Sequence, residues 1–368
     1  MPELADKEVH KPRPRRRVVL ACVLTLVLVD VAVRLAQPVW NEYSPDEYAE
    51  RVNGCARQQR DLVFVGGSPI AEGINPDHLG SITWQGTNVD DVYCVGLSGG
   101  TTTDIYFGTR SACPQPPKLL VYGMTASDIN DSRHEPHGVH SLLTWNDVQD
   151  WRATRPDAAE WVTRHYAKDR ALNLWATAQN AHAIRLWGAV RLASVLPSAC
   201  PETVAEAQRQ CRQYLELTTK RGYVPTPWFA SRQYDQMKAG GWVQPNFEYL
   251  ARYKTGSHLK YLERLLDWAE DRDVTVVVVD MPTTADLQAR HPAEFAEYRS
   301  RLTEVCQRRG IRLLSADQQS TGLTDNHFAD LIHLNRAGSD RLSNWMGDEL
   351  RRLGAEPARS AVVRGQQP

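Results

Sequence analysis

Two patterns of apolar and polar positions take turns along much of the chain: short, continuous apolar runs, and apolar residues at helical spacing. Short apolar runs are typical of buried strands, and they predict strands at Leu62–Val65, Val92–Leu97, Lys118–Gly123, Val274–Val279 and Ile311–Leu314. Apolar residues at helical spacing lie between or after these runs, and they predict helices at about Thr102–Arg110, His258–Glu270, Pro292–Arg309 and Arg336–Leu353. Short apolar strands separated by helices indicate βαβ units and a parallel sheet.

The pattern changes between about residues 142 and 255. This segment has no strand-like run, and its Trp, Arg and Ala residues recur at helical spacing. We therefore predict an α/β domain over residues 61–353 that is interrupted by a helical insert at about 142–255. Residues 354–368 show no periodic pattern, so we expect a disordered tail there.

The N-terminal region predicts a membrane segment. Residues 1–17 form a basic tail, and residues 18–36 are almost continuously apolar apart from Asp30 and Arg34. Because spanning a bilayer takes roughly 17–25 residues, this run is long enough. The positive flank places the N-terminus in the cytoplasm and the rest of the chain outside. We expect an uncleaved single-pass signal anchor, followed by a juxtamembrane connector at 37–60. A cleaved signal peptide is the alternative.

Charge and cysteine usage exclude some classes of protein. The formal net charge of −1 argues against a nucleic-acid partner. Of the seven cysteines, six lie outside the apolar segment, and an even number there fits disulfides in an oxidising compartment. Cys200 and Cys211 make the most plausible local pair. The sequence contains no CxxC, so we expect neither a zinc or redox site nor a cofactor.

Four segments that follow predicted strands carry residues suited to chemistry. They are "GGSPI", "GLSGGTT", "GMTASDIND" and "DNHFADLIHLNRAG", in chain order. Because functional groups gather at the carboxyl ends of parallel strands, we expect these four segments to converge on one site.

The last segment supplies a base and a group to orient it. Asp330 and His333 stand three residues apart in a loop before a helix, so the carboxylate can fix the imidazole tautomer and stabilise the imidazolium. Ser68 is then the alcohol that His333 deprotonates. Taken alone, Ser68 reads as a turn or N-cap serine and His333 as a helix-start residue. Their combination at matching strand ends favours a catalytic role.

An acyl-transfer serine also needs donors for an oxyanion. The backbone N–H of Ser68 is one candidate, and Gly99 in the "SGG" turn offers a second. A third often comes from a side-chain amide, for which Asn130 is available.

In these segments the chain resembles the SGNH/GDSL hydrolase superfamily. "GGSPI" is similar to the first consensus block, with Gly67 where many members carry Asp, and "GLSGGTT" is similar to the second. "DLIHLN" matches the Asp-x-x-His block closely. The resemblance implies a three-layer α/β/α flavodoxin-like fold, a triad of Ser68, His333 and Asp330, and Gly99 in the oxyanion hole.

The third block departs from the family pattern. The usual Gly-x-Asn-Asp is absent from "YGMTASDIND", and the resemblance leaves Asn130, Asp128 or Ser127 for that position. The resemblance covers about residues 61–131 and 273–350.

The layout resembles membrane-anchored extracytoplasmic members linked to O-acylation of cell-surface polysaccharides, which work beside membrane-bound O-acyltransferases. This implies an O-acyltransferase or esterase, with acetyl as the expected acyl group and a cell-surface or exported polysaccharide, or an acyl-sugar, as substrate. The alternative is a catalytically degenerate SGNH-fold protein that binds glycans or assists assembly at the membrane. The missing third block supports that alternative, and the intact Asp330–His333 pair counts against it.

Overall fold

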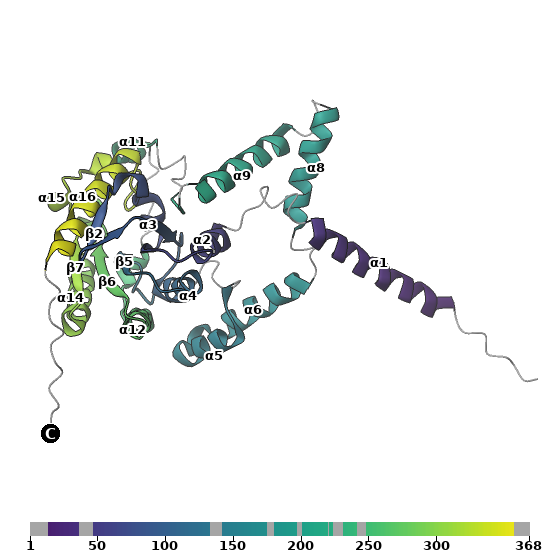
Figure 1. The fold of residues 1–368 in the computed structure, drawn as a ribbon, viewed down its shortest axis with the longest axis horizontal. Helices are drawn as coiled ribbons and strands as arrows, with labels where there is room; N and C mark the ends of the chain where they lie inside the picture. Colours follow the sequence, from purple (N-terminus) through teal and green to yellow (C-terminus); the bar gives the residue numbers. More distant parts are fainter. Residues whose placement is uncertain are drawn as a thin grey trace, which may run out of the picture. The chain divides into compact units, whose positions relative to one another are not determined.

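The structure is a computed structural model that describes residues 14–36, 47–132, 142–174, 180–196, 201–219, 221–223, 231–240 and 248–356. The chain divides into two compact units (Figure 1). One comprises residues 1–44 and 167–211, and the other comprises residues 45–166 and 212–368. Most of the predicted basic tail, part of the predicted connector and most of the predicted disordered tail lie outside the described residues.

The larger unit is built on a five-stranded parallel sheet. The sheet has the order β4-β1-β5-β6-β7, which is the 2-1-3-4-5 order of flavodoxin-like folds. Its strands are β1 (Leu62–Gly66), β4 (Val92–Gly96), β5 (Leu119–Met124), β6 (Thr275–Asp280) and β7 (Arg312–Ser315). In register, Gly66 lies beside Gly96 on one side and Gly123 on the other. The prediction of an α/β fold with a parallel sheet is confirmed, and each predicted strand is present to within one or two residues.

Helices cover both faces of this sheet. The sheet-flanking helices are α2 (Glu47–Ala56), α3 (Ser68–Gly73), α4 (Thr102–Ala112), α12 (Ser257–Glu270), α14 (Pro292–Arg309) and α16 (Arg336–Ala355). Helices α3 and α16 pack against each other, and α4 packs against both α2 and α12. Short elements complete the unit: η3 (Pro76–His78), α13 (Ala285–Arg290), α15 (Gln318–Thr321) and η7 (Asp325–His327).

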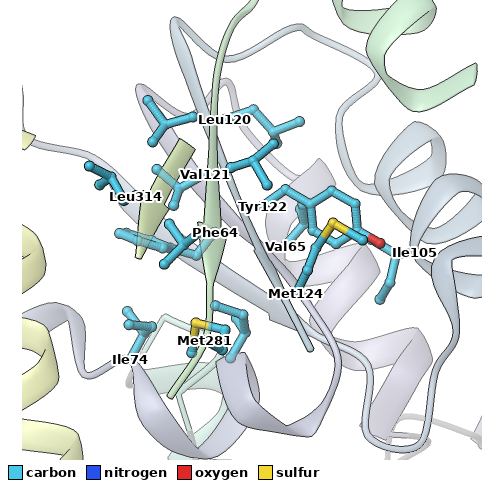
Figure 2. Close-up of a cluster of buried hydrophobic side chains, with 14 of the residues drawn as sticks. Phe64, Val65, Ile74, Ile105, Leu120, Val121, Tyr122, Met124, Met281 and Leu314 are labelled. Atoms are coloured by element: carbon cyan, nitrogen blue, oxygen red, sulfur yellow. The ribbon is translucent and has the colours of Figure 1, made fainter. Parts of the chain in front are cut away.

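The core lies on both faces of the central strands, so every residue of β1 and β5 is buried. Figure 2 shows how successive residues alternate between the faces. Phe64 and Val121 point towards Ile74, while Val65 and Tyr122 point towards Ile105 of α4. This alternation is the period of two that a strand imposes on its side chains. Two packed faces hold the strand ends, and hence the loops that follow them, in fixed positions.

A small hairpin was not predicted. Strands β2 (Ile82–Trp84) and β3 (Thr87–Val89) form a two-stranded antiparallel sheet that contacts α16. The turn residues Gln85 and Gly86 both have positive φ, at 49° and 78°. Positive φ at both positions is characteristic of a type I′ hairpin turn.

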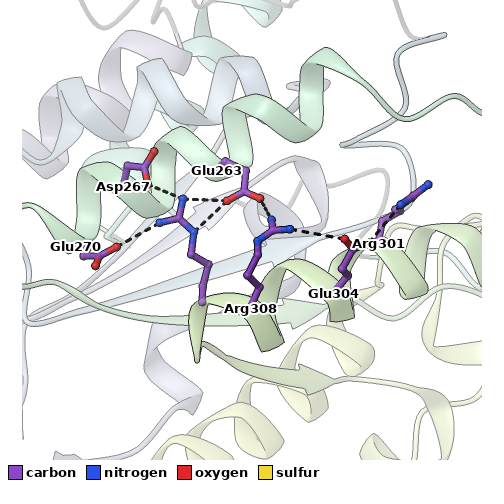
Figure 3. A network of polar contacts seen from close by, with 7 residues as sticks. Glu263, Asp267, Glu270, Arg301, Glu304 and Arg308 are labelled. Carbon is purple, nitrogen blue, oxygen red and sulfur yellow. Dashed lines mark hydrogen bonds and ion pairs between the residues drawn. The ribbon is translucent and has the colours of Figure 1, made fainter. Parts of the chain in front are cut away.

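Ion pairs connect α12 to α14 on the surface of the unit. In Figure 3, Arg308 contacts Glu263 and Glu304, while a second arginine reaches Glu263, Asp267 and Glu270. The second arginine is Arg309, whose Nη1 lies 3.2 Å from Glu270 Oε2. Exposed pairs of this kind each contribute about 0–1 kcal/mol, so the network supplements the apolar packing.

All the regular elements that the structure describes in the predicted insert are helices, joined by turns and irregular segments. Its elements are α5 (Trp145–Thr154), η5 (Pro156–Ala158), α6 (Ala159–Leu174), α8 (Ala181–Val195), α9 (Pro201–Thr219), α11 (Tyr234–Ala239) and η6 (Glu248–Arg252). The first of them belongs to the α/β unit, because Trp151 stacks on Phe107 of α4 with ring centroids 5.4 Å apart. The insert is therefore divided between the two units.

The smaller unit contains the N-terminal apolar helix, α1 (Pro14–Ala36). Residues Val18–Ala36 are long and apolar enough to cross a membrane. Most of their large side chains are exposed, whereas Asp30 is buried and accepts a 2.9 Å hydrogen bond from Arg34. Near its C-terminal end, Val33 and Ala36 pack against a small cluster formed by α8 and α9.

The cysteines of the α/β unit are buried thiols. Cys55, Cys94, Cys113 and Cys306 form no disulfide. Burial raises the pKa of Cys306 to about 12. The predicted Cys200–Cys211 pair is not tested, because Cys200 lies outside the described residues.

Candidate active site

Ser68 is placed by the junction of β1 and α3. It follows the β1 residue Gly66 and the helix N-cap Gly67, and it is the first residue of α3. Pro69 occupies the next position, where its fixed φ suits the first turn of a helix. The junction is tight, since a Cβ on Gly66 would lie only 2.5 Å from the carbonyl oxygen of Gly123. The serine hydroxyl therefore stands at the carboxyl edge of the sheet.

His333 lies in a loop that is closed by several backbone contacts. Phe328 and Leu334 form an isolated antiparallel bridge, and Ala329 N–H donates to the carbonyl of His333 at 2.8 Å. Asn335 then caps α16, because its Oδ1 accepts from Gly338 N–H at 3.0 Å. The loop thus has a defined shape before any ligand is present.

A chain of hydrogen bonds joins the three predicted triad residues. His333 Nε2 lies 2.8 Å from Ser68 Oγ, and His333 Nδ1 lies 2.7 Å from Asp330 Oδ2. Both distances are within the range of a normal hydrogen bond. The structure therefore brings together Ser68, His333 and Asp330 across a separation of more than 260 residues, from 68 to 333.

Asp330 is held as an ionised carboxylate. Its second oxygen, Oδ1, accepts backbone N–H bonds from Ile332 at 2.9 Å and His333 at 2.7 Å. Burial alone would raise the pKa of Asp330, but the charge of His333 and these hydrogen bonds together keep that pKa below its ordinary value. An ionised Asp330 accepts from Nδ1–H and leaves Nε2 able to take a proton from Ser68.

The Gly99 loop lies beside the serine. Leu97 N–H donates to the carbonyl of Gly66 at 2.8 Å, and Gly100 N–H closes a turn to the carbonyl of Leu97 at 2.8 Å. Gly99 has φ +75°, in the left-handed region that glycine tolerates best. A Cβ on Gly67 would stand 3.6 Å from the carbonyl oxygen of Gly100, which places this loop next to the residue that precedes Ser68.

Asn130 is fully buried and anchors a neighbouring loop. Its Oδ1 accepts from Ser132 N–H at 3.1 Å, Ser132 Oγ at 2.9 Å and Lys254 N–H at 3.0 Å. These contacts fix the orientation of the side-chain amide, whose Nδ2 is on the opposite branch from Oδ1.

Asp128 organises the turn after β5. Its Oδ2 accepts from Thr125 N–H at 2.6 Å, and its backbone carbonyl accepts from Thr102 N–H at 3.1 Å. Thr125 Oγ1 also lies 2.6 Å from Ser127 Oγ. Asp128 therefore ties the loop after β5 to the start of α4, and its predicted role in binding an oxyanion or substrate stays a prediction.

Asp128 also gives a reason for the glycine at position 67. A Cβ on Gly67 would meet Asp128 Oδ1 at 3.5 Å, which is an ordinary contact distance. An aspartate at position 67 would place its carboxyl group beside that of Asp128, and the two would repel wherever both are ionised.

The sequence did not indicate the contribution of α2. Tyr48 Oη donates to the carbonyl of Ser98, and Ser98 Oγ lies 3.5 Å from Glu47 Oε1. Arg51 Nη1 donates to the carbonyl of Gly96 at 2.6 Å. Glu47, Tyr48 and Arg51 share one face of α2, in a segment that the sequence predicted only as a connector.

The insert also reaches this region. Asn335 Nδ2 donates to the carbonyl of Arg232 at 3.0 Å, and the following helix α11 contacts η7. Part of the insert therefore lies against the loop that carries His333.

Comparisons of the chain with known proteins find similar solved structures but no family. No family model matches it, and no curated protein matches it. One similar solved structure is described as a "putative acylhydrolase" from Bacteroides fragilis NCTC 9343. The match covers 83% of this chain and 95% of that chain, at 11% identity and a TM-score of 0.35.

Proposed function

We propose that the protein is a serine-dependent acyl-ester enzyme, either an O-acyltransferase or an esterase. The observation that carries this proposal is the hydrogen-bonded series Asp330–His333–Ser68, with heavy-atom distances of 2.7 and 2.8 Å. Nucleophile, base and orienting group in hydrogen-bond contact are the arrangement that activates a serine.

In the proposed reaction, Ser68 Oγ attacks the carbonyl carbon of an ester and His333 Nε2 accepts the hydroxyl proton. Asp330 stabilises the imidazolium, which then protonates the leaving alcohol. The acyl-serine is resolved by water in an esterase, or by a sugar hydroxyl in a transferase, with His333 again acting as base.

The tetrahedral oxyanion needs donors beside Ser68. We assign this role to the backbone N–H groups of Ser68 and Gly99, and to Asn130 Nδ2 as a third donor. The left-handed turn at Gly99 and the fixed amide of Asn130 support the assignment. Fixed donors of this kind stabilise the charge that develops in the transition state.

The proposed substrate is a cell-surface or exported polysaccharide, with acetyl as the acyl group. Support comes from α1, since an apolar helix with exposed side chains suits a membrane anchor. We propose that the N-terminus is cytoplasmic and the α/β unit extracytoplasmic. A membrane-bound O-acyltransferase is the proposed partner. The Ser68–His333 contact counts against a purely glycan-binding role.

Turnover of p-nitrophenyl acetate by the full-length protein in detergent tests the proposal. Ser68→Ala is expected to lower kcat/KM by roughly 10⁴-fold or more, and unchanged thermal unfolding shows that the variant is folded. Equal rates for the two proteins would contradict the proposal. Adding acetylated and non-acetylated oligosaccharides, with mass spectrometry of the products, then separates transfer from hydrolysis.

A further inference from the structure

We propose that Tyr48, in the helix that precedes the sheet, positions the Gly99 donor of the oxyanion hole. The inference depends on the proposed function, because Gly99 has this role only in an acyl-transfer site. Tyr48 is a positioning residue, since it acts through the Ser98–Gly99 peptide.

Tyr48 and the Gly99 N–H are linked through one peptide unit. Tyr48 Oη donates to the carbonyl oxygen of Ser98. That carbonyl and the N–H of Gly99 belong to the same planar trans peptide, in which C=O and N–H point in opposite directions. Fixing the carbonyl therefore fixes the direction of the Gly99 N–H. A hydrogen bond to the carbonyl also polarises the peptide, which makes its N–H a better donor.

The backbone turn at Gly99 needs a contact from outside the turn to hold it in one orientation. Gly99 stands at φ +75° between Ser98 and a second glycine, Gly100. Glycines adopt many backbone conformations, so this turn has little intrinsic preference for one orientation. Catalysis by an oxyanion donor requires one orientation before the reaction begins.

Arg51 fixes α2 against the end of β4, next to Ser98. Arg51 is only 1% exposed and pairs with Glu47, one helical turn away. Arg51 Nη1 also donates to the carbonyl of Gly96 at 2.6 Å, and Arg51 Nε donates to the carbonyl of Gly222 at 3.1 Å. A buried charge requires such partners. They hold the first turn of α2 against the end of β4, and so they hold Tyr48 against Ser98.

Gly54, further along α2, allows the close approach. A Cβ at this position would lie 2.2 Å from Tyr93 Oη, so a larger residue would require the Tyr93 side chain or α2 to shift. Helix α2 is therefore packed as part of the site's support, although it lies outside the segments that resemble the SGNH blocks.

The test is Tyr48→Phe in the full-length protein, which removes only the hydroxyl. Deleting a whole oxyanion donor costs about 10²–10³ in kcat, so loss of its orientation is expected to lower kcat roughly 10- to 100-fold. KM for p-nitrophenyl acetate, the pH dependence of the rate and the thermal unfolding midpoint are expected to stay unchanged. The matched control is Tyr261→Phe, because that buried tyrosine lies among Phe107 and Trp151, in a different cluster.

Labelling by a fluorophosphonate separates this inference from the proposed function. Its tetrahedral adduct uses the same oxyanion donors, so Tyr48→Phe is expected to be labelled at least several-fold more slowly than the wild type and Tyr261→Phe at the wild-type rate. If Tyr48→Phe keeps the wild-type kcat, or if only its KM changes, Tyr48 does not position the Gly99 donor. That result would not affect the assignment of Ser68 as the nucleophile. Labelling that persists in Ser68→Ala would instead overturn the proposed function.

Discussion

At the scale of single residues, the site depends on the charge state of Asp330. The carboxylate accepts three hydrogen bonds, two from backbone N–H groups and one from His333 Nδ1. Burial alone would raise the pKa of Asp330, but His333 and these bonds lower it, so Asp330 is ionised at neutral pH and favours the tautomer that the proposed base His333 requires.

This leads to a prediction for Asp330→Asn. The substitution is expected to lower kcat by about 10⁴-fold, since an amide favours the wrong imidazole tautomer. A carboxyl whose folded-state pKa is lowered contributes stability above its ordinary pKa of 3.8, and that contribution is lost as the pH falls through the folded-state value. The wild type is therefore expected to be more stable than Asp330→Asn at pH 7.

Urea unfolding at pH 7 and pH 3 measures the difference. The stability gap between the two proteins should narrow at pH 3, because below pH 3.8 protonation begins to remove the contribution of Asp330. A gap that widens on acidification would show that the Asp330 carboxyl is not stabilised in its ionised form.

The sequence indicated those residues of the candidate site that can be recognised from their neighbours in the chain. Asp330 and His333 are three residues apart, and Ser68 lies two residues after the end of a strand, so nearby residues in the sequence carried the signal. Tyr48 and Arg51 could not be found in this way. Their partners Ser98 and Gly96 lie 50 and 45 residues further along the chain. Only the packing of α2 against β4 brings them together.

At the scale of elements, the β1–α3 junction contains two consecutive glycines, Gly66 and Gly67, that differ in the space around them. Gly66 faces the backbone of the adjacent strand, and its Cβ would overlap the carbonyl of Gly123. Gly67 has φ −77°, and its Cβ would meet its neighbours at 3.5 Å or more. Position 66 therefore has no room for a Cβ and requires glycine, whereas position 67 has room for one.

We predict that Gly66→Ala lowers the free energy of unfolding by about 1–3 kcal/mol, because the strands or α3 must shift. The matched variant Gly67→Ala is expected to change it by no more than about 0.5 kcal/mol. Chemical denaturation of both proteins checks this. Equal destabilisation by the two substitutions would mean that the junction is packed differently.

The short length of β2 and β3 explains why the sequence pattern did not predict their hairpin. Strands β2 and β3 have three residues each, too few for an alternation of apolar and polar positions to stand out. Their turn uses Gln85-Gly86, whereas the usual signal for a type I′ turn is Asn-Gly or Asp-Gly. The longer strands were predictable because both faces of each are buried.

At the scale of the whole molecule, the apolar helix α1 and the α/β sheet belong to separate compact units. The sequence predicted both, because each depends on a long local pattern. It did not predict how the helical insert divides. Residues 142–166 belong to the sheet unit and 167–211 to the unit of α1, a division that arises from tertiary contacts such as Trp151 with Phe107.

We predict that the full-length protein stays with the membrane fraction after alkaline carbonate extraction, since α1 is long and apolar enough to span. The basic residues before it should keep the N-terminus in the cytoplasm. Reporter fusions at the two ends check the orientation, with a C-terminal reporter active only outside the cytoplasm. Release by carbonate, or an active cytoplasmic reporter at the C-terminus, would contradict the anchor.

The central claim is that Ser68 is a nucleophile activated by His333. The most direct measurement is reaction of the full-length protein with a fluorophosphonate at pH 7, followed by intact-mass analysis and peptide mapping. We predict one adduct on Ser68, none in Ser68→Ala and a greatly slowed reaction in His333→Ala. An unlabelled wild type, or an adduct that remains in Ser68→Ala, would contradict the account.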